Sequence, residues 1–340
     1  MKIKLKRLLY LGYYFYKMNW SLYLRFLKIA ADQSATSRFS LVVTSIKDSL
    51  RYNISLLEFF QFRFYQKNEF EKSSWAGTGF MYEYHLAMNP KNKRAILEDK
   101  SLFLTTYKEF VKHEHLTLET LKQKQQLAVD FLKKNKKIVL KSSKGQCGIG
   151  IAIMPSKGLA PSGLITKLEE TENDIVEAFI EQHEDLNKLS PSGLNTLRLI
   201  TQLNNKNQVE ILGARIRITV NNSVDNLAAG NLASEVDLSS GKITREAVYS
   251  DISKSNQKRH PITKETFKGF QIPFFDEALT MVKEAALRFP QNRSIGWDVA
   301  ITKTGPELVE ANHDWCKLLW QLPVNKGLKR RLIHYLEELK

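Results

Sequence analysis

The sequence predicts an α+β protein in which a helical N-terminal region precedes two parts that mix strands with helices. Residues 1–72 contain few glycines or prolines, and Leu56, Phe60 and Phe64 recur there at helical spacing. After Asn135 the pattern changes to short apolar strands, KKIVL and IAIM among them, separated by loops rich in glycine and serine. A hairpin pattern close to the C-terminus completes the prediction.

The hairpin is the segment GWDVAITKTGPELVEANHDW, residues 296–315. If the chain reverses near Thr304, Asp298 lies opposite Glu310, and Asn312 points to the same side because strand side chains alternate. Two carboxylates facing each other repel unless a cation lies between them. Two acids and an amide oxygen are ligands that Mg²⁺ prefers, and Mg²⁺ usually binds together with substrate phosphates. The alternative is a solvated hairpin whose acids face water.

Composition limits the functional classes. The 340 residues are enough for a full core, and the two cysteines, Cys147 and Cys316, are too few for a disulfide framework and lack the spacing of a zinc site. We therefore expect a reducing, cytoplasmic compartment, where ATP is available. The net charge of +15 admits nucleic acid as a partner, but no binding motif supports it, so we expect none.

Residues 1–30 carry seven Lys or Arg and no acid, interleaved with aromatic runs such as LLYLGYYFY. The longest uncharged apolar run, Leu8 to Tyr16, is too short to span a bilayer. Two interpretations remain open. The segment lies on an anionic membrane surface, at the inner membrane face, or its aromatic side chains pack onto the body of the protein.

A lysine followed by glycines suggests a phosphate site. Lys141 ends a strand, and Gly145, Gly148 and Gly150 follow in the ribbon to the next strand. Glycines let backbone N–H groups approach phosphate oxygens, and a lysine adds a point charge. The segment is not a Walker A motif, and an ordinary glycine hairpin is the alternative.

Charged residues on later apolar strands complete the candidates. Glu177 lies in IVEAFIEQHEDL, where a strand end can contact an adenine edge and Glu184 can hold ribose hydroxyls, although solvated acids explain the pattern as well. Arg198, Arg215 and Arg217 need anionic partners on their apolar strands. A triphosphate, a substrate carboxylate or a structural ion pair would each satisfy them.

The order of these features resembles the ATP-grasp superfamily, which includes the D-alanine–D-alanine ligases and biotin carboxylases. The resemblance covers about residues 100–320 and implies two α+β subdomains that clasp ATP. It implies that the Mg²⁺ ligands are Asp298, Glu310 and Asn312, and that Arg198 and Arg215 lie near the triphosphate and the reacting carboxyl group. It also implies a set of nucleotide contacts from the phosphate-binding lysine, the lid over the phosphates, the adenine-binding linker and the ribose-binding acid: Lys141, Ser142, Lys144, Gly145, Gly148, Glu177, Phe179, Ile180 and Glu184.

The front of the chain resembles the sugar-transfer-associated branch of that superfamily, found with cell-surface polysaccharide genes. The segments SLLEFFQFRFY, NKRAIL and SPSGLNTLRLIT carry this likeness together with the hairpin. The implied division has four parts: a helical, basic and aromatic region at 1–100, a first subdomain with the glycine-rich lid at 101–175, a second with the metal site at 176–325, and a C-terminal helix at 326–340.

The resemblance implies an ATP-dependent carboxylate–amine ligase that acts through an acyl phosphate and joins an amino acid or other amine to a sugar acid, with a small or lipid-linked sugar as substrate. A kinase on the same scaffold and a non-enzymatic, membrane-associated partner of a glycosyltransferase are the alternatives.

Overall fold

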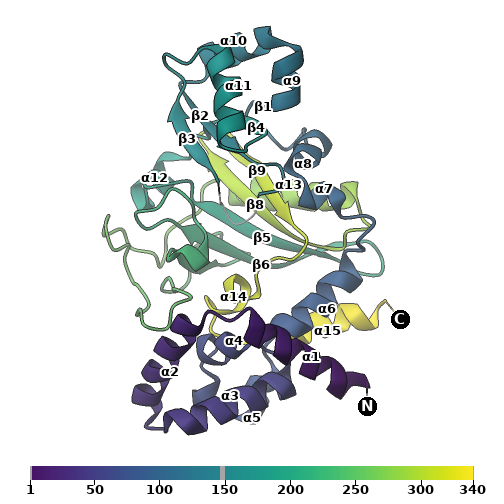
Figure 1. The fold of residues 1–340 in the computed structure, drawn as a ribbon, viewed down its shortest axis with the longest axis vertical. Helices are drawn as coiled ribbons and strands as arrows, with labels where there is room; N and C mark the ends of the chain where they lie inside the picture. Colours follow the sequence, from purple (N-terminus) through teal and green to yellow (C-terminus); the bar gives the residue numbers. More distant parts are fainter. Residues whose placement is uncertain (1, 146–149, 340) are drawn as a thin grey trace.

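The computed structural model describes residues 2–145 and 150–339, and the side chains of residues 5–145 and 150–339. The chain begins with a helical region. Residues 2–73 occupy the lower end of the molecule in Figure 1, whereas residues 95–106 lie higher up, beside the strands. The elements of this region are α1 (Lys2–Tyr16), α2 (Trp20–Ser34), α3 (Arg38–Tyr52), α4 (Leu56–Gln61), η1 (Phe64–Gln66), α5 (Glu69–Ser73), α6 (Thr78–Met88), α7 (Ala95–Glu98) and α8 (Lys100–Thr106). The predicted helical character is confirmed, and Ser55 with Glu58 forms a capping box at the start of α4.

The N-terminal helices enclose an aromatic core of their own. Phe26, Phe59, Phe60 and Phe64 are fully buried there, and Ile252, from a long loop after β7, packs against the same cluster. The helical region is therefore joined to the rest of the protein by apolar contact as well as by the chain.

The first sheet has the order β1-β4-β2-β3, and all its strand pairs are antiparallel. Its elements are β1 (His115–Thr117), α9 (Leu118–Gln123), α10 (Gln125–Lys134), β2 (Lys137–Lys141), β3 (Ala152–Pro155), α11 (Pro161–Glu170) and β4 (Ile175–Ala178). Its helices and strands bury a separate apolar cluster that includes Leu121, Phe131 and Leu140. The predicted boundary at residue 175 falls inside β4, which pairs with β1 and β2.

The second sheet has the order β7-β6-β5-β8-β9 and is covered on one face by α13. The elements of this part are α12 (Glu184–Leu189), β5 (Thr196–Leu203), β6 (Val209–Ile218), η2 (Leu227–Ala229), β7 (Leu232–Val236), α13 (Phe275–Arg288), β8 (Ser294–Thr302), β9 (Gly305–Asn312), α14 (Lys317–Gln321) and α15 (Lys329–Glu337). Alternation sends Leu197, Trp297 and Val299 into the core beneath α13, which leaves the charged residues of these strands on the other face.

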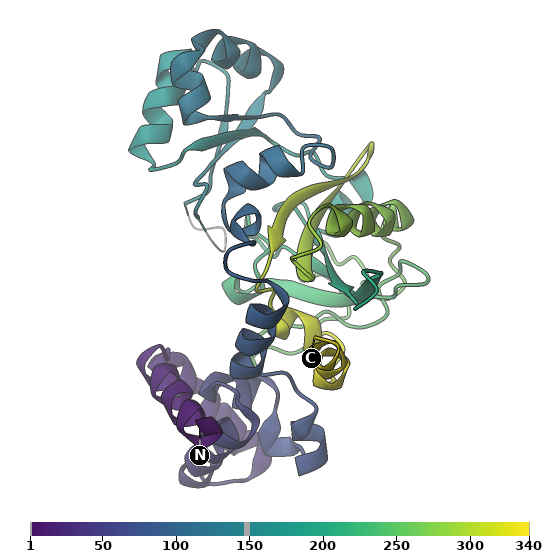
Figure 2. The ribbon, with the colours of Figure 1, turned by 90° about the vertical axis from the view of Figure 1, so that its right-hand side faces the viewer.

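Figure 2 shows the three parts stacked along the long axis, with the second sheet between the N-terminal helices and the first sheet. The N-terminal region is tied to the C-terminal segment by backbone contacts. Gln321 exchanges two hydrogen bonds of 2.9 Å with the backbone of Ala76, and the Lys329 amide donates to the Ser74 carbonyl at 2.9 Å.

The predicted α+β class with a helical front is confirmed. Among the described helices, none combines the length and apolar character needed to cross a membrane.

Candidate active site

Strands β8 and β9 place two acids opposite each other. The predicted pairing of Asp298 with Glu310 is present, although the turn itself pairs Thr302 with Gly305, half a residue away from a reversal at Thr304. A bulge between Asp298 and Val299 leaves one residue of β9 unpaired and brings Glu310 opposite Asp298. The extra residue in β9 shifts the alternation of that strand, so Glu310 lies on the charged face of the sheet.

Asp298 is buried and is held by two arginines. Arg198 Nε donates to one carboxylate oxygen, and Arg217 Nη2 donates to the other at 2.7 Å. Burial opposes the charge of Asp298, but the two guanidinium groups outweigh it and hold the pKa of Asp298 below its usual value. Arg217 also reaches Asp225 at 3.2 Å, and these acids raise its pKa despite burial.

Glu310 and Asn312 are half-buried on the strand that faces Asp298. In the part of the chain that the structure describes, Glu310 has no hydrogen-bond or ion-pair partner, while the Asn312 amide nitrogen donates to the Gly296 carbonyl at 3.4 Å. No cluster of three or more His, Cys, Asp or Glu suited to a metal occurs within residues 2–145 and 150–339. Two carboxylates and an amide oxygen fit Mg²⁺ only if phosphate or water oxygens complete its shell, which is its usual mode of binding.

Arg215 has a different environment from the one expected for a catalytic group. Its Nε and Nη2 donate to the Trp320 carbonyl of α14 at 3.1 and 2.6 Å, and burial lowers its pKa to about 10. The structure therefore gives Arg215 a contact that supports α14, whereas Arg217, two residues further along β6, reaches the acid of the predicted metal site.

A chain of buried charges connects the two sheets. Lys141 Nζ lies 2.5 Å from Glu177 Oε1, His113 Nε2 lies 3.4 Å from Glu177 Oε2, and His113 Nδ1 lies 2.7 Å from Glu307 Oε2. Lys141 and Glu177 belong to β2 and β4 of the first sheet, whereas Glu307 belongs to β9 of the second. The carboxylate predicted to face adenine is thus also the central member of an ion-pair chain.

Protonation of His113 balances this chain. Burial opposes the charge of His113, but the carboxylates of Glu177 and Glu307 outweigh it and raise its pKa to about 9. The Lys141 and His113 charges overcome the burial of Glu177 and lower its pKa to about 2. At neutral pH cations and carboxylates therefore alternate along the chain, from Lys141 through Glu177 and His113 to Glu307.

We expect the stability supplied by His113 to be lost at high pH. Because its pKa rises from 6.5 to about 9 on folding, the stabilisation is complete below pH 6.5 and disappears as pH rises through 9. It amounts to on the order of 3 kcal/mol, from the rule that one pKa unit corresponds to about 1.4 kcal/mol. Urea unfolding at pH 6 and pH 9.5 should show that His113→Gln is destabilising at pH 6 and much less so at pH 9.5. The exposed control His334→Gln should show no such difference, and equal losses for His113→Gln at both pH values would contradict the expectation.

Lys100 is a further charged residue near these groups, and no sequence pattern predicted a role for it. Its amine donates to the Gly145 carbonyl, and its backbone amide donates to the Ser143 carbonyl at 3.0 Å. Its pKa is lowered, chiefly by burial, and the charges of Glu310, Lys141 and Glu177 also act on it. Lys100 therefore interacts electrostatically with both the acid of β9 and the lysine of β2.

The remaining predicted nucleotide contacts are distributed along the lid and the linker. Ser142 accepts a hydrogen bond from Gly145 in a turn, Lys144 is exposed, and Gly148 lies outside the described residues. In the linker, the Phe179 amide donates to the Lys137 carbonyl at 3.1 Å, and the Lys137 amine lies 3.9 Å from the centre of the Phe179 ring.

After Phe179 the linker reaches the second sheet. Ile180 is half-buried, and the His183 amide donates to the Ile301 carbonyl of β8 at 2.7 Å. Glu184 begins α12 and is exposed. The linker thus runs from β4 to the edge of the hairpin that carries Asp298.

The family can now be assigned. Residues 80–336 match the family described as sugar-transfer associated ATP-grasp. The chain belongs to this family. The prediction of an ATP-grasp enzyme is confirmed at the level of the family, and the two antiparallel sheets with their helices are the ATP-grasp fold.

Solved structures with similar folds include three ATP-grasp proteins. The biotin carboxylase domain of 2-oxoglutarate carboxylase from Hydrogenobacter thermophilus, solved with MgADP, ADP and bicarbonate, is 14% identical, with a TM-score of 0.40 and coverage of 73% of this chain and 52% of that one. D-alanyl-alanine synthetase A from Vibrio cholerae is 12% identical, with a TM-score of 0.41 and coverage of 71% and 60%. D-alanine–D-alanine ligase from Helicobacter pylori is 12% identical, with a TM-score of 0.42 and coverage of 72% and 60%. No curated protein matches the sequence. The chain spans between 52% and 60% of the length of these solved chains.

Proposed function

We propose that this ATP-grasp protein is an ATP-dependent carboxylate–amine ligase that acts through an acyl phosphate. The proposal is supported by the electrostatic interaction of Lys100 with Lys141 and Glu310, and by the pairing of Glu310 with Asp298 on the neighbouring strand. Two cations together with two acids are suited to a triphosphate with its metal ion.

The proposed chemistry has two steps. A carboxylate oxygen of the first substrate attacks the γ-phosphorus of ATP, the bond to the β,γ-bridging oxygen breaks, and ADP leaves. An amine nitrogen then attacks the carbonyl carbon of the acyl phosphate, inorganic phosphate leaves, and the nitrogen loses a proton to give the amide. Positioning and charge stabilisation account for catalysis in such transfers, so no covalent nucleophile is required.

The proposal assigns a role to each of these residues. Lys141 and Lys100 bind phosphate oxygens, while Arg198 and Arg217 hold Asp298 ionised and in place. Asp298, Glu310 and Asn312 would hold Mg²⁺, which neutralises phosphate charge when bound. The chain through Glu177 and His113 fixes Lys141 relative to β9.

For substrates, we propose a sugar acid as the carboxylate and an amino acid or similar amine, in cell-surface polysaccharide synthesis. The support is the family's description as sugar-transfer associated.

The test uses hydroxylamine, which converts an acyl phosphate into a hydroxamate. The protein is incubated with ATP, Mg²⁺, hydroxylamine and each of a panel of uronic acids. Hydroxamate formed only with acid and ATP together supports the ligase. A phosphorylated sugar without hydroxamate would show a kinase instead.

We also propose that the first two helices contact the inner membrane face. On α1 and α2 a set of apolar side chains is at least half exposed, and those of α1 recur on one helical face: Leu5, Leu8, Leu9, Tyr13, Tyr16, Trp20 and Leu24. Tyr14, Tyr23 and Phe26 are buried instead. The aromatic residues of the segment are thus divided between the core and an outer surface.

Some of the described cations near this surface are engaged by other groups of the protein. Arg7 donates to the carbonyls of Leu50 and Arg51, and Arg25 pairs with Asp251 at 2.6 Å. Among described side chains, Lys17 and Lys28 form no ion pair and remain available to lipid headgroups. We therefore expect apolar insertion to contribute more to binding than charge.

Replacing two exposed apolar residues should weaken membrane binding by about tenfold or more, because each buried side chain contributes about 1.5–3 kcal/mol. The variant Leu9→Glu/Tyr16→Glu is compared with Ile262→Glu/Leu287→Glu, a control pair of apolar residues that are about half exposed elsewhere on the protein. Co-sedimentation with vesicles of phosphatidylglycerol and phosphatidylcholine measures binding. Equal sedimentation of both variants and of the unaltered chain would show that α1 does not insert.

A further inference from the structure

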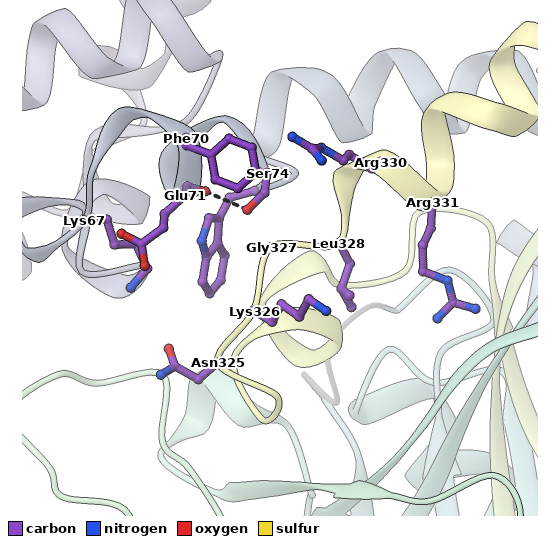
Figure 3. A pocket seen from close by; sticks show the side chains of 11 residues that line it. Lys67, Phe70, Glu71, Ser74, Asn325, Lys326, Gly327, Leu328, Arg330 and Arg331 are labelled. Atoms are coloured by element: carbon purple, nitrogen blue, oxygen red, sulfur yellow. Dashed lines mark hydrogen bonds between the residues drawn. The ribbon is translucent and has the colours of Figure 1, made fainter.

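A cleft of about 440 Å³ lies between the segment around α5 and the segment that leads into α15. Figure 3 shows Lys67, Phe70 and Glu71 on one side and Lys326 and Arg330 on the other. Both α5 and α15 lie on the side of the second sheet that faces away from the first sheet (Figure 1). The cleft is therefore separate from the candidate active site.

The lining of the cleft is cationic. Four cations, Lys67, Lys326, Arg330 and Arg331, face a single acid, Glu71. Within residues 5–145 and 150–339, none of the four cations forms an ion pair, and Arg331 is held by the Leu212 carbonyl at 2.8 Å. Partial burial lowers the pKa of Lys67, and the charge of Glu71 does not offset this effect.

Aromatic rings hold two of these cations in place. The Arg330 guanidinium lies 4.8 Å from the centre of the Phe70 ring, and the Lys67 amine lies 5.4 Å from the centre of the Trp75 ring. Phe70 is 68% exposed, so its ring offers an apolar surface next to the charges. Cation–π contact orients the two charges without neutralising them, which leaves both available to an anion.

The two walls are fixed before any ligand arrives. The Lys329 amide bonds to the Ser74 carbonyl, and Gln321 bonds to the backbone of Ala76 from the other wall. A Cβ at Gly327 would collide with the backbone of Ser74, so the walls meet as closely as glycine permits. A cleft held in this way costs little ordering when it binds a ligand.

We propose that this cleft binds a phosphate-bearing ligand with at least two negative charges, whose ring or apolar part lies on Phe70. Unpaired arginine and lysine groups at one place suit phosphate, because the guanidinium fork binds two oxygens at once. The cleft also falls within the volume range of small-molecule sites. This site is additional to the proposed ATP site, and its existence does not depend on the ligase assignment.

The test is calorimetric titration with inorganic pyrophosphate. The variant Lys326→Gln/Arg330→Gln should lose one binding event or weaken it about tenfold, with the melting temperature and ATP turnover unchanged. The control Lys157→Gln/Lys268→Gln removes the same charge at exposed lysines elsewhere and should bind as the unaltered protein does. Identical titrations for the two variants would overturn the proposal. Arg330→Lys should give an intermediate affinity, because it keeps the charge and loses the fork.

Two further arms identify the source of the phosphate. Glucose 1-phosphate in solution and an isoprenyl diphosphate in neutral vesicles are each tested for displacement of pyrophosphate from the cleft. Displacement by the first assigns a soluble sugar phosphate, and displacement by the second assigns a lipid carrier. Failure of both would overturn the assignment of an organic phosphate ligand.

Discussion

Glu310→Gln is expected to reduce Mg²⁺-dependent ATP turnover about a hundredfold or more, the loss typical of removing one electrostatic group from a transferring centre. Glu310 forms no hydrogen bond or ion pair among the described side chains, and it faces the buried carboxylate of Asp298. Without metal the substitution removes a repulsion, so the melting temperature should stay the same or rise. ATP consumption and metal-free thermal unfolding measure the two effects.

The control for this variant is Glu284→Gln, which removes one exposed carboxylate from α13. It should leave turnover unchanged. If Glu310→Gln kept its turnover at saturating Mg²⁺, the assignment of a metal site to β8 and β9 would be wrong.

Lys141→Ala should weaken ATP binding far more than adenosine binding, and it should also destabilise the fold. Removing the lysine leaves Glu177 buried with His113 as its remaining cationic partner. Breaking a buried pair on one side costs about 3–5 kcal/mol. Calorimetry with ATP and with adenosine reports the first effect, and urea unfolding reports the second.

A second substitution separates phosphate binding from structural support. Lys141→Ala/Glu177→Gln removes the unpaired charge together with the lysine, so it should recover much of the stability that Lys141→Ala loses. ATP affinity should remain low in the double variant. Recovery of both properties together would mean that Lys141 serves only the ion-pair chain.

The sequence allowed the fold class and the pairing of the central acids to be predicted, because both follow from local periodicity. Alternation in β8 and β9 identified Asp298 and Glu310, although the assumed reversal at Thr304 differs from the observed turn. The predicted pairing is nevertheless present, because the bulge shifts the register of β9 by one residue and places Glu310 opposite Asp298. A bulge of this kind has no reliable sequence signal, so its position could not be inferred.

Tertiary contacts were beyond the reach of sequence patterns. Arg215 and Arg217 share a strand face, and nothing in the alternation shows that the first reaches α14 while the second reaches Asp298. Lys100 and His113 lie at a helix start and in a loop, where a charged residue is ordinary. Their importance comes from groups distant in the chain, such as Glu307 for His113. The N-terminal aromatic residues are divided between the two interpretations: some pack in the core, as Phe26 does, and others are exposed, as Tyr16 is.

The first sheet and its helices form one continuous segment whose ends meet. The Ala178 amide donates to the Glu114 carbonyl at 2.8 Å, and His115 pairs with Glu177, so the chain enters and leaves this part at the same place. The apolar cluster of the segment, from Leu116 to Ala178, is made of its own residues. Such a segment can unfold and refold as a cooperative unit while the second sheet stays intact, at a free energy below that of global unfolding. In folding terms, the chain behaves as one host structure that carries an autonomous insert, and the buried ions between His113 and Glu307 set how strongly the two are coupled.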